Sequence, residues 1–249
     1  MQIQELVNYL DTYLNASLFK DFAPNGLQVE GRNEVKRIVL GVTACQSLID
    51  FAVREKADAI LVHHGWFWKG EPAPVVGMKR RRLAAVLASD INLIAYHLPL
   101  DAHPEVGNNA EIARLLDLKI EKKTGFYDLL NIGVPNSPTT IEDMVERVTK
   151  VLNRKPVLVG RPSGPVKRIG WCTGAAQDEL LEAVNEGCDL YISGEISERT
   201  NYEALENGVT YLAAGHHATE RFGIQALGRH LQIVFPELEI QYFESNNIV

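Results

Sequence analysis

The sequence predicts an α/β protein of two similar three-layer α/β lobes related by an internal repeat, and three observations lead to this prediction. Apolar strands alternate with amphipathic helices through most of the 249 residues, which is typical of a largely parallel sheet with helices on both faces. The strand and helix order of the first half returns in the second half. Apolar residues make up 46% of the chain, and no run approaches the roughly 18 consecutive apolar residues of a membrane span.

The first lobe is expected to begin with a helix. The opening MQIQELVNYLDTYL carries apolar and acidic residues at helical spacing, and it lacks the basic leader and cleavage site of a signal peptide. Strands and helices then alternate. The expected strands are 37–44, 58–64 and 92–98, and the expected helices are 45–57, 81–90 and 108–118.

The second lobe repeats this order after a short connection. A strand at 129–134 leads through a proline-bearing turn into a helix that ends at 152, for which Ser137 or Thr139 is the expected cap. The polar stretch EKKTGFYD marks the boundary, so the lobes are expected at 1–124 and 125–249, and the C-terminal helix and strand could pack back on the first lobe. The expected strands are 167–174, 188–195, 209–216 and 237–245, and the expected helices are 177–187, 197–208 and 217–232.

The net charge and the cysteine content indicate which partners the protein binds and in which cellular compartment it lies. The formal net charge of −7 opposes broad non-specific binding to nucleic acid. Cys45, Cys172 and Cys188 share no CxxC spacing, which is typical of reduced thiols. We therefore expect a cytoplasmic protein with neither a nucleic-acid partner nor a membrane contact.

Residues able to bind metals follow the strand ends of both lobes. His63 and His64 end one strand in LVHHG. In the second lobe, His216 and Glu220 stand four residues apart at the end of a strand. In the first lobe, His97 and Asp101 have the same spacing after the matching strand. We do not expect this match by chance from seven histidines.

Reactive groups of parallel α/β sheets lie beyond the carboxyl ends of the strands. If the lobes pack with these ends facing, the six residues converge on one cleft between them. Imidazole and carboxylate ligands suit zinc, iron, manganese or nickel, and five or six of them suit two ions about 3.5–4 Å apart, bridged by a carboxylate and a water. The two adjacent histidines would then serve one ion each. The simpler alternative is a set of hydrogen-bonded core histidines.

For other residues near these motifs, the sequence is compatible with two roles each. Glu195 could orient a metal ligand or accept a proton, or it could cap the following helix. Trp66, Phe67 and Trp68 could wall a pocket, although packing on a neighbouring subunit is favoured. The cluster Lys79–Arg82 could attract an anion, although a solvated helical face is favoured. His217 could lie behind His216 or exchange roles with it, whereas His103 and His230 are expected to be ordinary residues.

The chain resembles the GTP cyclohydrolase I type 2 homologue family, also called the Nif-three-like family. The matching stretches run across nearly the whole sequence: PNGLQVEG (24–31), LGVTAC (40–45), ILVHHG (60–65), AYHLPLDAH (95–103), GWCTGAAQ (170–177), YISGE (191–195) and AAGHHATE (213–220). The resemblance implies a dinuclear metal site between two α/β lobes and a ring-shaped homohexamer. It also implies the metal ligands His63, His64, Asp101, His216 and Glu220, with Glu220 bridging, and leaves His97 as a close neighbour.

Two functions follow as expectations. The first is a metal-dependent hydrolase that acts on a nucleotide or another small substrate through a metal-bridging hydroxide, with His97 or Glu195 moving the proton. Its cofactors would be two divalent ions per subunit, drawn from Zn, Fe, Mn, Ni or Mg. The alternative is a non-catalytic, ring-shaped metal-binding scaffold or partner-binding protein, in which the ions lock the fold together.

Overall fold

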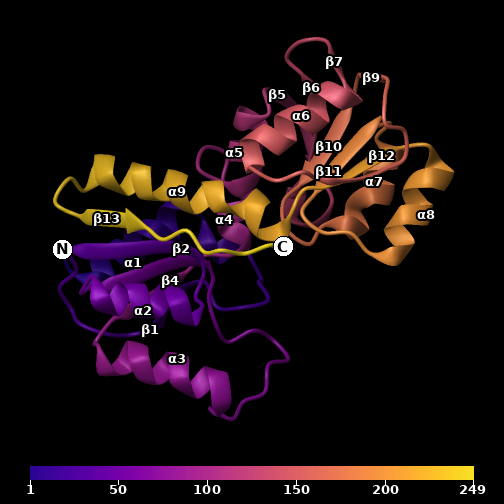
Figure 1. Cartoon of the computed structure of the whole chain (residues 1–249). Coiled ribbons are helices and arrows are strands. Elements are labelled where there is room, and N and C mark those ends of the chain that lie inside the picture. Colours follow the sequence, from indigo (N-terminus) through magenta and orange to yellow (C-terminus); the bar gives the residue numbers. More distant parts are fainter. The chain divides into compact units, whose positions relative to one another are not determined.

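The computed structural model describes residues 1–249, which divide into two compact units (Figure 1). The first unit contains Met1–Gly107 and Gly223–Asn246, and the second contains Asn108–Phe222 and Asn247–Val249. Each unit has its own sheet, and the predicted α/β class is confirmed. The expected boundary at 124/125 lies between two paired strands of the second unit, β5 (Leu118–Thr124) and β6 (Leu130–Pro135).

The first unit is built on a five-stranded sheet in the order β1-β4-β3-β2-β13. Neighbouring strands from β4 to β13 run parallel, while β1 is an antiparallel edge strand beside β4. The strands are β1 (Gly26–Val29), β2 (Arg37–Thr43), β3 (Ala59–His64), β4 (Asn92–Ala95) and β13 (Glu239–Tyr242). The parallel strands β2, β3 and β4 therefore end at the same edge of the sheet, which is where the candidate ligands follow.

Alternation along β2 places apolar side chains on both faces of this sheet. Ile38 and Leu40 belong to the core shared with α1 and α9, whereas Val39 belongs to the core shared with α2 and α3. The helices that cover the two faces are α1 (Ile3–Tyr13), α9 (His216–Val234), α2 (Gln46–Arg54) and α3 (Gly77–Ala88). This is the three-layer arrangement that two-sided apolar strands predict.

The second unit is built on a six-stranded sheet in the order β5-β6-β10-β11-β12-β8. The three central strands are parallel, and the flanking strands β6 and β8 are antiparallel to their neighbours. The remaining strands of this sheet are β8 (Val157–Val159), β10 (Ile169–Cys172), β11 (Leu190–Ser193) and β12 (Thr210–Ala213). The central parallel strands of the two units, β2-β3-β4 and β10-β11-β12, follow the same chain order.

Helices also cover the second sheet. Apolar residues of α5 (Asn108–Leu115), α6 (Ile141–Leu152) and the start of α9 share one core with the central strands. The other helices are α7 (Leu180–Asn185) and α8 (Glu198–Asn207). Helix α6 is capped by Thr140, whose hydroxyl accepts a hydrogen bond from Asp143 N at 3.2 Å, so the predicted caps Ser137 and Thr139 were wrong. Those two residues precede the helix because Thr139 and Thr140 pair as a short strand β7 with β9 (Pro165–Val166).

Several short elements are absent from the sequence prediction. The edge strands β1 and β5 carry polar residues, so their apolar pattern is weak, and the edge strand β8 has only three residues, too few to show a pattern. The helix α4 (Leu98–Ala102) begins where strand 92–98 was expected to continue, because β4 ends at Ala95.

All three cysteines are free thiols. No helix of the structure combines the length and apolar character needed to cross a membrane.

Candidate metal centre

Three histidines gather at the edge of the first sheet where β3 and β4 end. His63 and His64 are the last residues of β3, and His97 immediately precedes α4. One ring nitrogen from each lies within 4.8 Å of the others. The ring centres of His63 and His64 are 4.4 Å apart, so these adjacent residues both contribute to one cluster at the strand end.

His63 is fully buried, and its orientation is fixed by the backbone. Its Nδ1 lies 3.0 Å from the carbonyl oxygen of Tyr96. Because a carbonyl can only accept, Nδ1 carries the proton and Nε2 carries the lone pair of the neutral ring. Nε2 lies 3.6 Å from Oδ1 of Asp101, a buried carboxylate on α4. The structure therefore brings together a buried imidazole nitrogen and a buried carboxylate oxygen.

The ring of His64 is also held through its Nδ1 atom, in this case by a side chain of the neighbouring strand β2. Its Nδ1 lies 3.1 Å from Oγ1 of Thr43, the residue of β2 that pairs with His64 in the sheet register. Thr43 belongs to the stretch LGVTAC but was not predicted as a site residue, because a threonine at a strand end is common in any sheet.

His97 is held by a polar segment of the N-terminal region. Its Nδ1 lies 2.7 Å from Oδ1 of Asp21, and its backbone N–H donates to Oδ1 of Asn25 at 2.8 Å. Asp21 is 7% exposed and also accepts from Leu98 N and Asn25 Nδ2, both at 2.9 Å. Burial opposes the charge of Asp21, but the hydrogen bond and charge of His97 outweigh it, so the pKa of this carboxyl falls to about 2.

An aromatic side chain packs on the same imidazole. The ring of Trp68 meets His97 nearly edge to face, with 5.0 Å between centres, and lies 6.0 Å from the ring of His64. By contrast, Trp66 is a core residue that donates to Ala44 O at 2.9 Å, and Phe67 is 37% exposed. The three aromatic residues therefore have three different environments, and only Trp68 contacts the histidine cluster.

The second unit contains a separate group of candidate metal ligands at the start of α9. His216 begins this helix and Glu220 follows one turn later, with Nε2 of His216 lying 3.0 Å from Oε2 of Glu220. The other nitrogen of His216, Nδ1, lies 2.7 Å from Oε1 of Glu195, which follows β11. Glu195 thus orients His216, and the helix cap is Ser197. Glu220 is 3% exposed.

These two carboxylates change the protonation of His216. Burial lowers the pKa of the imidazole, but the hydrogen bonds and negative charges of Glu220 and Glu195 outweigh it and raise the pKa to about 9. An imidazole held between two carboxylates attracts a positive charge, either a proton or a metal ion. Between the two candidates for this position, the structure pairs His216 with Glu220, while His217 is a buried neighbour.

A glycine leaves room for Glu220. Gly174, in the stretch GWCTGAAQ, has φ +70°, and a Cβ placed on it would overlap Oε1 of Glu220. A left-handed conformation and a side-chain carboxylate in the same space both require glycine here. Gly174 was not predicted as a site residue, although its motif contributed to the family resemblance.

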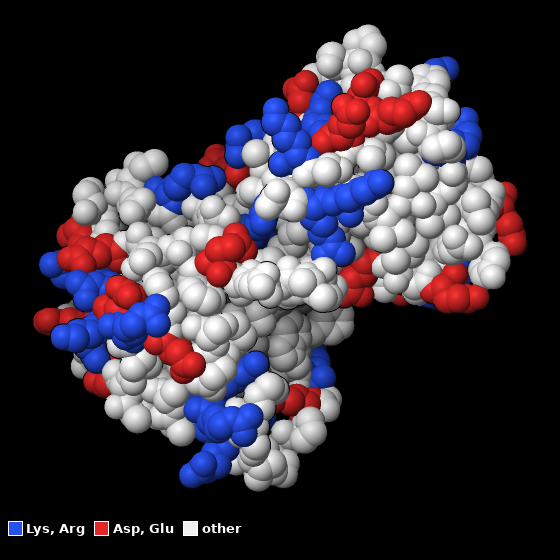
Figure 2. Space-filling model, in the orientation of Figure 1, with Lys and Arg blue, Asp and Glu red and all other residues white.

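The remaining candidates lie elsewhere. His103 contacts Tyr13 O through Nε2 at 3.1 Å, and His230 lies 2.5 Å from the hydroxyl of Tyr9, so both pack beside α1. Lys79, of the basic cluster Lys79–Arg82, pairs with Glu71 at 3.2 Å. Basic side chains gather over α3, but elsewhere on the visible face positively and negatively charged side chains are interspersed (Figure 2).

The donor set of each group fits a divalent metal ion. In every histidine of the two groups, Nδ1 faces an oxygen that holds the ring, which is how ligating imidazoles are commonly fixed in metalloproteins. Nε2 of His63 and of His216 approaches a carboxylate oxygen. Nitrogen and carboxylate oxygen suit zinc, iron, manganese and nickel.

A family model described as Duf34/NIF3 (NGG1p interacting factor 3) matches residues 1–248. The chain belongs to this family. A relative from Neisseria meningitidis serogroup A, named GTP cyclohydrolase 1 type 2 homolog, is 48% identical over 244 residues and 98% of both chains. A Pseudomonas aeruginosa protein of the same name is 50% identical over 232 residues and 92% of both chains.

The fold is also that of solved family members. The structure described as protein ybgI, of unknown function, superimposes with a TM-score of 0.95 at 44% identity over the whole of both chains. A protein from Thermus thermophilus gives a TM-score of 0.89 at 33% identity, again over both whole chains. The family resemblance inferred from the sequence motifs is confirmed.

Proposed function

We propose that this chain is a metal-dependent hydrolase in which His63, His64, Asp101, His216 and Glu220 together hold two divalent ions. The observation that carries the proposal is the shared orientation of the histidines, whose Nδ1 atoms face fixed oxygens in both units. A core histidine needs only one such partner, whereas Nε2 of His63 and of His216 also approaches a buried carboxylate.

The number of ligands supports a joint site. The first unit offers two imidazoles and Asp101, and the second offers one imidazole and Glu220. The three ligands of the first unit match one open catalytic ion, the two of the second unit are too few for a separate ion, and five together suit two ions that keep open positions. The metal identity stays open among zinc, iron, manganese, nickel and magnesium, because ligand type alone does not select among them.

The bound ions would supply Lewis acidity, which lowers the pKa of a water molecule towards 7 and polarises the bond to be cleaved. We propose that His97 moves the proton, and the contact of its Nδ1 with Asp21 supports this because it leaves Nε2 for the reacting groups. The ring of Trp68 packs against that of His97, whose side chain is 17% exposed. Glu195 is the second candidate for proton transfer, since its side chain is 38% exposed and contacts His216.

The name shared by the relatives, GTP cyclohydrolase 1 type 2 homolog, makes GTP the first substrate to test. The test uses chelator-treated protein reloaded with each divalent metal, incubated with GTP and a panel of other nucleotides, with products followed by mass spectrometry. We expect turnover that requires metal and falls at least about 100-fold in His97→Ala, which retains the five ligands. Turnover that persists in the presence of chelator would contradict the proposal.

The alternative is a non-catalytic metal-binding assembly, and one observation supports assembly in both proposals. Several apolar side chains before and along α3 are exposed, including Val76 at 67%, Met78 at 56% and Leu87 at 60%. Apolar surface of this kind is typical of an interface. We propose a homohexamer of this chain in either case. If the ions serve assembly alone, metal removal should dissolve the oligomer in light scattering, and no substrate should turn over.

A further inference from the structure

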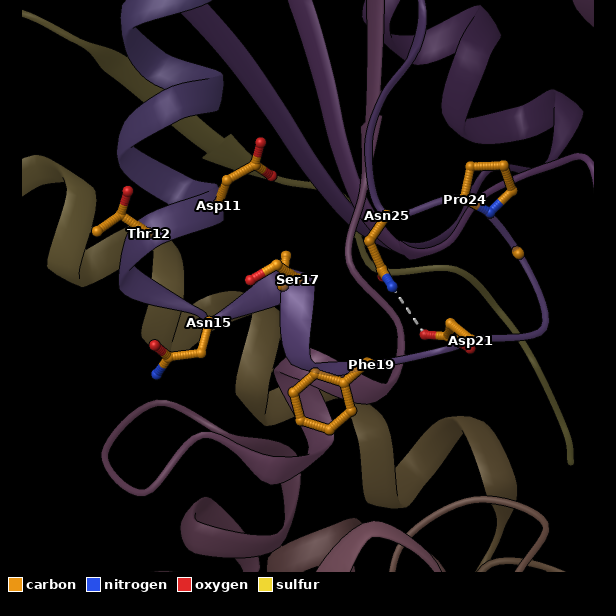
Figure 3. Close-up of a pocket in the computed structure, with 10 residues that line it drawn as sticks. Asp11, Thr12, Asn15, Ser17, Phe19, Asp21, Pro24 and Asn25 are labelled. Atoms are coloured by element: carbon orange, nitrogen blue, oxygen red, sulfur yellow. Dashed lines mark hydrogen bonds between the residues drawn. The ribbon is translucent and has the colours of Figure 1, made fainter.

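A cavity of 630 Å³ lies in the first unit, between the end of α1 and the segment that leads into β1 (Figure 3). The residues that line it are Asp11, Thr12, Asn15, Ala16, Ser17, Phe19, Asp21, Ala23, Pro24 and Asn25. Its volume is in the range of small-molecule pockets and far above what a single ion needs. None of these residues belongs to the five proposed metal ligands.

The lining is polar and negatively charged. Six of the ten residues carry a hydroxyl, amide or carboxylate, two of them are aspartates, and none is lysine, arginine or histidine. The aspartates therefore give this wall a formal charge of −2 at neutral pH. The ring of Phe19 adds an aromatic surface, which attracts cations through its face.

The carboxylate of Asp11 is held in a fixed position. The hydroxyl of Tyr96 donates to its Oδ1 at 2.6 Å, and Tyr96 is fully buried, which raises the pKa of this phenol and keeps it a donor. Gly26 has φ +97°, and a Cβ on it would come within 3.3 Å of the same oxygen. The contacts of Asp11 that the structure shows thus engage Oδ1, and Oδ2 has no hydrogen bond from the chain.

The second carboxylate connects the cavity to the histidine cluster. Asp21 lines the cavity and accepts from His97 Nδ1 at 2.7 Å. Asn25, also in the wall, donates to Asp21 at 2.9 Å, as the dashed line in Figure 3 shows. A ligand in the cavity would therefore lie one side chain away from His97.

We propose that this cavity binds a small organic cation, of the primary ammonium class, through Asp11, whose Oδ1 is held by Tyr96 and whose Oδ2 faces no donor of the chain. An oriented carboxylate with one oxygen not engaged by the chain matches the N–H donors and the positive charge of such a ligand. The hydroxyls and amides of Thr12, Asn15 and Ser17 are additional acceptors for the same donors. The proposal is independent of the hydrolase activity, because Asp11 is not one of the five proposed metal ligands and its hydrogen bond goes to Tyr96.

The test uses 1,4-diaminobutane as the probe and 1,4-butanediol as its uncharged counterpart, with isothermal titration calorimetry on chelator-treated, metal-free protein at low salt. We expect one equivalent of diamine to bind with a Kd below about 1 mM and the diol to show no binding. Asp11→Asn keeps the shape and the acceptor for Tyr96 but removes the charge, so the affinity should fall at least about 10-fold.

The matched control is Asp50→Asn, which removes an exposed carboxylate of α2 and should leave the affinity unchanged. Circular dichroism and thermal melting establish that both variants are folded. The proposal is overturned if the diamine shows no binding at about 10 mM, if the diol binds equally well, or if Asp11→Asn binds like the wild type. Because no turnover is measured, failure of the hydrolase proposal would leave this result unaffected.

Discussion

The carboxylate of Asp21 and the imidazole of His97 lie 2.7 Å apart, although 76 residues separate them in the sequence. The Asp21 side chain is 2% exposed and that of His97 is 17% exposed. Backbone N–H groups of Phe22 and Leu98 also donate to Asp21, so its orientation is fixed from both segments. The pair therefore sets which nitrogen of His97 carries the proton and which way the ring faces.

Asp21→Asn should loosen this orientation. The amide keeps the size of the side chain but removes the charge that favours an Nδ1–H hydrogen bond, so His97 can adopt other tautomers. In the metal-loaded protein we expect kcat to fall about 10- to 100-fold with a small change in KM, once a substrate is in hand. Equal activity of Asp21→Asn and wild type would show that His97 needs no such positioning.

Glu195→Gln should weaken metal binding through His216. The amide can still contact Nδ1, but the negative charge that makes the ring a stronger ligand is gone, and loss of such partners typically costs about 10- to 100-fold in affinity. Competition with a chromophoric chelator measures the change. The control is Glu198→Gln, an exposed carboxylate three residues along, for which metal affinity should be unchanged.

In metal-free protein, the free energy of unfolding should decrease as the pH rises into the alkaline range. The pKa of His216 is raised from 6.5 to about 9 in the folded chain, since its two carboxylates outweigh burial. A raised folded pKa gives stability that is complete below about pH 6.5 and is lost as pH rises through about 9. We expect the free energy of unfolding in urea to fall by about 1–2 kcal/mol over this range.

The same measurement on Glu195→Gln provides the control, because one of the two raising carboxylates is then neutral. Its pH dependence should be smaller than that of the wild type. A flat profile for the metal-free wild type, or an equal slope in Glu195→Gln, would show that Glu195 does not stabilise the protonated ring.

Gly174→Ala should displace Glu220. The new methyl group would occupy the space of Oε1, and the left-handed backbone would add strain of about 1 kcal/mol. Gly187→Ala is the matched control, because Gly187 has φ +76° and open space around its Cβ position. Both variants should lose stability in thermal melts, but only Gly174→Ala should also lose metal affinity. Equal metal affinity in the two variants would argue against the contact with Glu220.

Much of the fold could be predicted from the sequence because the central strands are apolar on both faces. β2, β3, β10 and β11 were expected within a few residues of where they lie. The edge strands β1 and β5 were missed because polar residues interrupt their apolar pattern, and β8 was missed because it is only three residues long. The cap of α6 was also missed, since Ser137, Thr139 and Thr140 are equivalent by residue type and only the short β7–β9 pairing distinguishes them.

The histidines of the candidate site could be predicted because two adjacent histidines end a strand and the spacing of a histidine and a carboxylate is repeated in the second half. Asp21, Asn25 and Thr43 could not, because each supports a histidine through a contact that is distant in sequence. Aspartate, asparagine and threonine are common loop residues, and nothing in their spacing links them to HHG or to His97. Such partners become visible only when the tertiary structure brings the segments together.

The most direct test of the central claim is the metal content per chain, measured by elemental analysis on protein purified without chelator. The account predicts about two equivalents of divalent metal in the wild type and a loss of most of it in the double variant His64→Ala, Glu220→Ala, which removes one ligand from each unit. Absence of metal after reconstitution, or full retention in the folded double variant, would contradict the dinuclear site and leave these histidines with a structural role.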